Sequence, residues 1–95
     1  MEIESVRHKA LLAFMVSGKS KGLPSNLVDR LRKMLVWLDA IDRTNDLYVP
    51  PNYGAHQLTG DRAGMWSLTV SRNWRMTFRV TDMLTIEDLD LEDYH

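Results

Sequence analysis

Residues 66–80 read WSLTVSRNWRMTFRV, and this stretch decides the fold class. Apolar and polar residues alternate on either side of Ser71-Arg72-Asn73, a sequence that favours a tight turn. A period of two is typical of strands that bury one face and expose the other. The stretch therefore predicts an antiparallel hairpin, in which Trp66 and Trp74 are better suited to core packing than to stacking on a ligand.

Two apolar stretches with helical spacing precede this hairpin. The first ends at Ser17-Gly18, where glycine can adopt the left-handed conformation that closes a helix, and its apolar face comprises Val6, Ala10, Leu11 and Phe14. The second covers about residues 25–42 and starts after Pro24, with Ser25 or Asn26 as the expected capping residue. Both stretches predict helices with one buried face.

The remaining segments connect and complete the sheet. Residues 43–55 predict an irregular crossing that is held to the core by Leu47, Tyr48, Val49 and Tyr53. A short strand is expected at residues 56–58, and a last strand after Thr81-Asp82. In this last strand Leu84 and Ile86 fall on one face, whereas Leu89 and Leu91 fall on the opposite face. A bulge near Asp88, or a strand with both faces partly covered, would account for this change.

These elements predict one α+β domain over residues 1–95, with two N-terminal helices packed on one face of a three- to four-stranded antiparallel sheet. With 44% hydrophobic and 26% charged residues, the chain is expected to be globular. It contains no Cys, which excludes disulfides and thiolate nucleophiles and fits a cytoplasmic location. No apolar run approaches the roughly 20 residues that span a bilayer, so no membrane association is expected.

The net charge of −1 is a sum over two unlike regions. Residues 1–81 hold all 12 Lys and Arg and seven of the 13 Asp and Glu, which leaves a net charge of +5. Residues 82–95 hold the other six acids and no base. A basic body with an acidic end indicates an anionic ligand and local charge compensation, although short segments often have biased charge by composition alone.

Two groups of polar residues are candidates for chemistry. Arg75, Thr77 and Arg79 share one face of the hairpin, where they form an anion surface or serve solubility alone. The final residues, Glu92-Asp93-Tyr94-His95, concentrate groups suited to proton transfer, or form a frayed acidic end.

The residue types narrow the chemistry further. The three His residues, His8, His56 and His95, are far apart, and no metal-binding motif or glycine-rich phosphate loop occurs, so no metal or other cofactor is expected. Acid–base catalysis by His and carboxylate remains, with Arg as the electrostatic stabiliser. This set suffices for RNA cleavage, because RNA supplies its own 2′-hydroxyl as the nucleophile.

Four ordered motifs carry a resemblance to a known family: HQLTGDR at 56–62, MWSLTV at 65–70, NWRMTF at 73–78 and EDYH at 92–95. Together they resemble the HigB toxins, which belong to the RelE superfamily of type II toxin–antitoxin systems. The resemblance covers nearly the whole chain and implies helices packed on a curved antiparallel sheet. It also implies a ribosome-dependent mRNA endonuclease that cuts in the A site, leaves a 2′,3′-cyclic phosphate and halts translation.

The resemblance implies partners and site residues as well. The expected partners are messenger RNA on the ribosome and a HigA-like helix-turn-helix antitoxin, through which the toxin would reach operator DNA. The residues that match the family's catalytic positions are His56, Arg75, Asp93, Tyr94 and His95. The two His residues are expected to act as general base and general acid, Arg75 to hold the scissile phosphate, and Asp93 to orient a His. Tyr94 would stack on a base or assist proton transfer.

Other positions are open to more than one interpretation. Arg62, Arg72 and Arg79 are candidates for RNA binding, although Asp61 and Arg62 could form a structural pair that fixes the turn. His8 matches the family's opening but is expected at the surface or in helix packing.

Two positions depart from the family pattern: Gln57 replaces the usual Pro, and Thr59 replaces a frequent Lys. The lost Lys favours an alternative function, in which a catalytically weak toxin fold serves as an antitoxin-binding, regulatory module.

Overall fold

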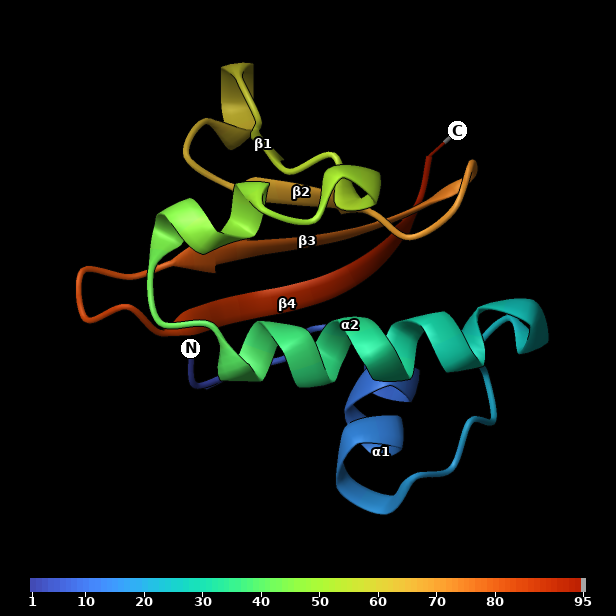
Figure 1. Cartoon of the computed structure of the whole chain (residues 1–95). Helices are drawn as coiled ribbons and strands as arrows, with labels where there is room; N and C mark the ends of the chain where they lie inside the picture. Colours follow the sequence, from blue (N-terminus) through green and yellow to red (C-terminus); the bar gives the residue numbers. More distant parts are fainter. Residues whose placement is uncertain (95) are drawn as a thin grey trace.

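The computed structural model describes residues 1–94, which form two α-helices, several short 3-10 turns and a four-stranded antiparallel sheet (Figure 1). Helix α1 spans Lys9–Ser17 and α2 spans Val28–Ala40. The strands follow in chain order across the sheet: β1 (His56–Gln57), β2 (Trp66–Thr69), β3 (Trp74–Val80) and β4 (Ile86–Asp93). The predicted α+β class and antiparallel sheet are confirmed.

Helix α1 is closed at both ends by local hydrogen bonds. The Nδ1 atom of His8 accepts a hydrogen bond from the backbone N–H of Leu11 at 3.1 Å, so this His is the N-cap of the helix. At the other end Gly18 has φ 76°, and its N–H donates to the carbonyl of Phe14 at 2.8 Å. The predicted glycine stop is therefore confirmed.

Helix α2 begins differently from the sequence-based expectation. A 3-10 turn at Ser25–Leu27 precedes it, and neither Ser25 nor Asn26 makes a side-chain capping hydrogen bond. The predicted cap is therefore wrong, because the turn leads directly into the helix through a bond from the N–H of Leu27 to the carbonyl of Pro24, at 3.0 Å. The helix directs its fully buried residues into the core: Leu31, Met34 and Leu38.

The segment before α1 pairs with the last strand of the sheet. Ile3 and Val6 form parallel bridges with Ile86 and Leu89 of β4. The backbone N–H of Arg7 donates to the carbonyl of Leu89 at 2.7 Å. The predicted helical position of Val6 is therefore wrong, because this residue is extended and covers the edge of β4.

The predicted hairpin is confirmed as β2 and β3, with Trp66 opposite Phe78 and Leu68 opposite Met76. These four side chains are buried, and they join apolar residues of α1, α2 and β4 in one core cluster. Trp74 is partly buried and packs against the same cluster. The expected core role of both tryptophans is therefore confirmed.

The predicted bulge in the last strand is confirmed at Asp88. This residue has φ 57°, a left-handed conformation that Asp tolerates better than most residues, and the β3–β4 register shifts between Thr77 and Arg79. Beyond the shift, Leu89 and Leu91 are buried in the core. Leu84 lies outside β4 in the preceding turn with φ 58°, so its predicted place in the strand is wrong.

The crossing at residues 43–55 contains only two 3-10 turns, Thr44–Tyr48 and Pro51–Tyr53. Leu47 is fully buried. Two tyrosines make edge-on ring contacts, Tyr48 with Trp66 and Tyr53 with Trp37. Val49 is 72% exposed, so its predicted packing role is wrong.

The packing of α2 gives a first prediction. Replacing Leu38, which is 0% exposed, with Ala is expected to lower the free energy of unfolding by about 2–5 kcal/mol, because it leaves a cavity in the core. Urea denaturation measures the change. Val36→Ala on the same helix is the matched control, and since Val36 is 67% exposed it should shift the free energy by less than about 0.5 kcal/mol. Equal losses in both variants would contradict the placement of α2.

Candidate functional site

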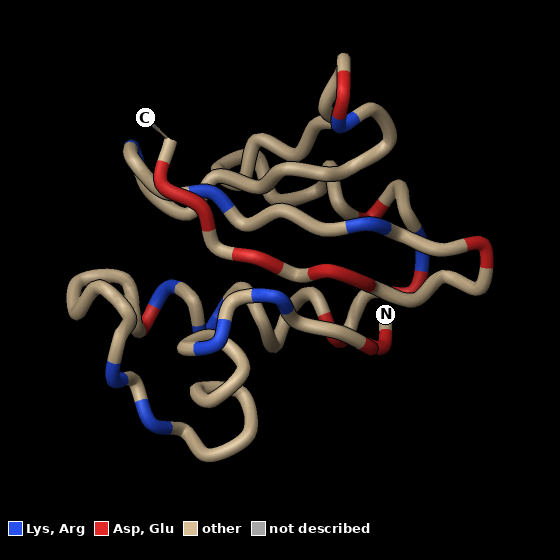
Figure 2. The backbone as a smooth tube through the Cα atoms, turned by 180° about the vertical axis from the view of Figure 1, so that it is seen from behind, with Lys and Arg blue, Asp and Glu red and all other residues tan. Residues whose placement is uncertain are grey.

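The sheet has a polar face on which β3 and β4 carry opposite charges. In the view from behind the molecule, basic positions of β3 lie beside acidic positions of β4 (Figure 2). The register places Arg75 opposite Glu92 and Arg79 opposite Glu87. Thr77 lies between the two arginines but is only 2% exposed, so the predicted solvent-facing row is covered at its centre.

A pocket of about 340 Å³ opens on this face near the end of β4. Four of the residues expected to act in catalysis or RNA binding line it: Arg62, Arg75, Asp93 and Tyr94. They come from the 3-10 turn at Gly60–Arg62, the start of β3 and the end of β4. The pocket is also lined by Leu58, Ser67, Thr77 and Glu92. The structure thus groups residues that are up to 36 positions apart in the chain.

Arg75 and Tyr94, two of the predicted catalytic residues, are in direct contact. The guanidinium carbon of Arg75 lies 3.5 Å from the centre of the Tyr94 ring. The backbone N–H of Tyr94 donates to the carbonyl of Asn73 at 2.6 Å, which holds the ring beside the β2–β3 turn. When a ring covers the flat face of a guanidinium, the N–H groups in the plane of the guanidinium stay available to an anion. The contact therefore orients Arg75 without consuming its donors.

Glu92 is the centre of a second set of contacts in the same pocket. Its carboxylate accepts two hydrogen bonds from the Arg62 guanidinium, one of them 2.9 Å from Nη1 to Oε1, and a third from the Thr77 hydroxyl. These bonds, the one from Arg62 first, hold the pKa of Glu92 below its usual value against the opposing effect of burial. The bond to Glu92 likewise raises the pKa of Arg62.

His56 lies outside this pocket on β1, two strands away from Arg75. Its Nδ1 atom is 3.0 Å from the carbonyl oxygen of Gly54. Since a carbonyl oxygen only accepts, this bond requires a proton on Nδ1 and leaves the Nε2 lone pair of the neutral ring available. The exposed imidazole can therefore exchange a proton at Nε2.

Two of the arginines expected to bind RNA, Arg72 and Arg79, do not line the pocket. Arg72 is exposed in the β2–β3 turn, and Arg79 pairs with Asp88 at 3.5 Å. Arg62 pairs with Glu92, so the alternative in which Asp61 and Arg62 form a structural pair is wrong. The prediction for His95 lies outside the described residues.

Sequence reasoning did not select Ser67, although it lines the pocket. Strand parity could have identified it, because it lies opposite Thr77 on the face that contains Arg75. Thr77 and Glu92 belong to the two polar groups that the sequence singled out, but no individual role was expected for either. The place of Glu92 opposite Arg75 depends on the bulge in β4.

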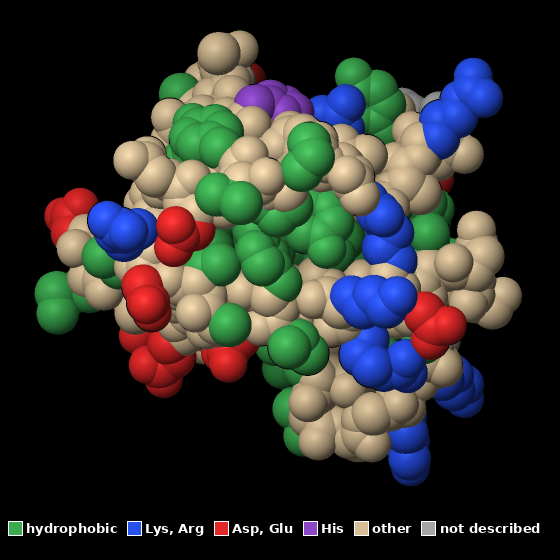
Figure 3. Space-filling model, in the orientation of Figure 1, with side chains coloured by type: hydrophobic (Ala, Val, Ile, Leu, Met, Phe, Trp, Pro, Cys, Tyr) green, Lys and Arg blue, Asp and Glu red, His purple; other side chains and the backbone are tan. Residues whose placement is uncertain are grey.

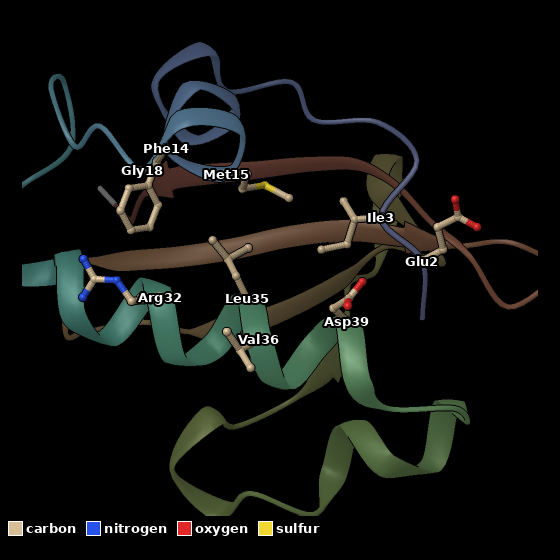
Figure 4. Close-up of a pocket in the computed structure, with 9 residues that line it drawn as sticks. All are labelled: Glu2, Ile3, Phe14, Met15, Gly18, Arg32, Leu35, Val36 and Asp39. Atoms are coloured by element: carbon tan, nitrogen blue, oxygen red, sulfur yellow. The ribbon is translucent and has the colours of Figure 1, made fainter.

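A second hollow, of about 400 Å³, lies between α1, α2 and the N-terminal segment (Figure 4). Its side chains are mainly apolar, including Phe14, Met15, Leu35 and Val36. Of the residues expected to take part in catalysis, those within 1–94 do not line it. On the face that carries α2, Lys and Arg side chains gather on one side and Asp and Glu on the other (Figure 3).

Within residues 1–94, no three or more His, Asp or Glu side chains are grouped so that they could hold a metal ion. No helix in that range has the length and apolar character needed to cross a membrane.

Two comparisons of the sequence with known proteins identify the same family. Residues 4–95 match a family model described as the RelE-like toxin of type II toxin-antitoxin system HigB. The chain is 38% identical over 93 residues to Endoribonuclease HigB of Proteus vulgaris, an alignment that covers 98% of this chain and 99% of that protein.

Solved structures with low sequence identity share the fold. The YoeB/ParE toxin from Agrobacterium tumefaciens aligns over 100% of both chains, with a TM-score of 0.58 and 14% identity. A chain of the E. coli DinJ-YafQ toxin-antitoxin complex aligns over 94% of this chain and 91% of its own length, with a TM-score of 0.53 and 19% identity.

The Arg62–Glu92 contact gives a prediction about pH. Because the pKa of Glu92 is lowered in the folded state, the unfolded chain binds protons more readily. The contact should therefore stabilise the fold fully above the ordinary Glu pKa of 4.5 and lose this effect as the pH falls through the lowered value. Since the Arg62 and Glu92 side chains are 45% and 30% exposed, we expect Glu92→Gln to cost about 1 kcal/mol or less near neutral pH.

Urea denaturation near neutral pH and at low pH measures this effect. The difference in unfolding free energy between the wild type and Glu92→Gln should shrink in acid. Glu87→Gln on the same strand is the control, and it should retain the acid sensitivity of the wild type. A difference for Glu92→Gln that is independent of pH would contradict the assigned ionisation.

Proposed function

The chain belongs to the HigB-like family of RelE-like toxins of type II toxin–antitoxin systems, and from this membership we propose that it is a ribosome-dependent endoribonuclease that cuts messenger RNA in the A site. The observation that carries the proposal is the pocket in which Arg75, Asp93 and Tyr94 converge on the polar face of the sheet. A relative that is 38% identical over nearly the whole chain is named an endoribonuclease, which supports the same conclusion.

The proposed reaction uses the RNA's own 2′-hydroxyl. A general base takes the proton of this hydroxyl, the O2′–P bond forms, and the P–O5′ bond breaks. A general acid gives a proton to the leaving 5′-oxygen, so the products are a 2′,3′-cyclic phosphate and a 5′-hydroxyl. Negative charge builds up on the phosphoryl oxygens between these steps, where a fixed cation lowers the barrier.

We assign the electrostatic role to Arg75 and the proton transfers to His56 and His95. The in-plane N–H groups of Arg75 suit two phosphoryl oxygens, while the Tyr94 ring holds the guanidinium from its face. His56 exchanges its proton at Nε2, because its Nδ1 is engaged with the Gly54 carbonyl. Asp93 is proposed to orient a His and to support its charged form.

The separation of His56 from Arg75 supports the proposed dependence on the ribosome. Within the described residues, His56 lies two strands from Arg75, so these two side chains do not by themselves align an RNA backbone. Alignment of the 2′-hydroxyl, the phosphorus and the leaving oxygen is worth several kcal/mol, and the ribosomal A site would supply it. We propose that Arg62, Arg72 and Arg79 contact the RNA around the pocket.

The proposed partner is a HigA-like antitoxin with a helix-turn-helix, through which the toxin reaches operator DNA in the cytoplasm. This proposal follows from the family, and a structurally similar chain is found in the E. coli DinJ-YafQ toxin-antitoxin complex.

A second candidate function is an antitoxin-binding module with weak or no catalysis. It is favoured by Thr59, which stands where the family often has Lys, and by the engagement of Arg62 with Glu92. A purified translation system separates the two candidates. Cleavage of translated message supports the enzyme, whereas antitoxin binding without cleavage at any toxin concentration supports the module.

The enzyme proposal predicts the effect of the two histidines. Expression of the wild type without antitoxin should stop bacterial growth, and His56→Ala and His95→Ala should each reduce message cleavage by about 10²-fold or more, because each removes a proton-transfer group. Growth after induction and primer extension on translated message measure the two effects.

The matched control is His8→Asn, which removes a third imidazole but keeps a side chain that can cap α1. This variant should remain as toxic as the wild type. Full toxicity of both His56→Ala and His95→Ala would refute the site assignment.

Arg75 gives a further prediction. Arg75→Lys should lower cleavage by at least about tenfold, since an ammonium group cannot donate two parallel hydrogen bonds or stack on Tyr94 as a guanidinium does. Arg32→Lys on α2, which is exposed and outside the pocket, should change it by less than about threefold. Single-turnover cleavage on programmed ribosomes measures both, and equal losses would contradict a special role for Arg75.

A further inference from the structure

The Glu92 carboxylate occupies a place where several hydrogen-bond donors converge. The Arg62 guanidinium binds both of its oxygens, and the Thr77 hydroxyl donates to one of them. Arg75 lies opposite Glu92 in the β3–β4 register and lines the same pocket. A guanidinium with two parallel N–H groups and an adjacent hydroxyl is also a donor set that recognises phosphate.

Ser67 adds an independent observation to this site. Its side chain is 1% exposed and lines the pocket, and its Oγ has no hydrogen-bond partner among residues 1–94. It lies opposite Thr77 in the β2–β3 register, on the same face of the sheet. A buried hydroxyl without a partner destabilises a fold, so such a group calls for an explanation. A ligand oxygen bound beside Thr77 would provide the missing partner.

We propose that Glu92 occupies a phosphate subsite for RNA, and that a backbone phosphate next to the scissile one displaces this carboxylate to bind Arg62, Thr77 and Ser67. The inference rests on the proposed function, because it takes RNA as the ligand. A carboxylate presents two oxygens to Arg62, as a phosphodiester does with its two non-bridging oxygens. Glu92 is 30% exposed, so it can turn outward into solvent when the phosphate enters.

The displacement gives Glu92 a role in selecting the substrate. The Glu92 carboxylate is charged at neutral pH and binds the donors of Arg62 and Thr77, so RNA must compete with a built-in anion for the same donors. Free RNA, which reaches the pocket without alignment, competes poorly. RNA that the ribosome holds in place competes well, since its phosphate is presented at a high effective concentration.

Binding to an uncleavable oligonucleotide tests the proposal without depending on catalysis. A labelled hexamer of 2′-O-methyl RNA is titrated with the purified protein, and fluorescence anisotropy gives the dissociation constant. Glu92→Gln is expected to tighten binding by about tenfold, because the competing charge is removed and the donors remain. Adding Arg62→Gln or Ser67→Ala to this variant should abolish most of the gain.

Glu87→Gln is the matched control. It makes the same charge change on the same strand, opposite Arg79 as Glu92 is opposite Arg75, but it lies outside the pocket. It should tighten binding by less than about twofold, the effect of net charge alone. Equal tightening by both variants, or weaker binding by Glu92→Gln, would overturn the proposal, the latter because Glu92 would then support Arg62.

If Glu92→Gln does not fold, the wild type decides the question. Inorganic phosphate is titrated to a large excess, which offsets the competition from Glu92, and should shift the NMR signals of the Arg62 side-chain N–H and of the Ser67 and Thr77 amides together. Shifts confined to other arginines would overturn the proposal. Message cleavage on ribosomes is measured separately, so binding as predicted without cleavage would refute the proposed function and leave the subsite intact.

Discussion

The alternation of side chains along β3 is the constraint on which the rest of the structure depends. This strand is paired on both sides, with β2 and with β4. The residues of β2 and β4 on its core face must therefore be apolar, and those on its other face can be polar. Met76 and Phe78 point into the core with the helices, and Arg75 and Thr77 belong to the face that carries the pocket. A shift of one residue in pairing would exchange these faces, because the side-chain period of a strand is two.

The bulge at Asp88 connects this constraint to the site. Without it, the pairing of Val80 with Ile86 would continue so that Arg75 lay opposite Leu91. The extra residue in β4 restores the pairing of apolar with apolar and of polar with polar residues, so that Leu91 lies opposite Met76 and Glu92 lies opposite Arg75. A single left-handed residue thereby keeps the core apolar and brings the carboxylate into the pocket.

The parts of the fold that were predictable from the sequence are those with local signals. Period, turn residues and a closing glycine predicted the hairpin, the bulge and the end of α1. The pairing of Val6 with Leu89 joins residues 83 positions apart, and no local pattern reports it. The site shows the same division, since the motifs of the resemblance selected Arg75, Asp93 and Tyr94, whereas the Arg62–Glu92 contact depends on tertiary structure.

The acidic end of the sequence acquires a different meaning in the folded chain. It is not a separate tail, because most of its acids lie on β4 beside the arginines of β3 (Figure 2). Arg62 is neutralised by Glu92 and Arg79 by Asp88, so these arginines create little long-range field. Under the proposed function, an RNA phosphate has to replace a specific carboxylate rather than follow a general attraction. The proposed displacement would favour RNA that is held at the pocket over RNA that diffuses past it, and would make the presentation of the message the source of selectivity.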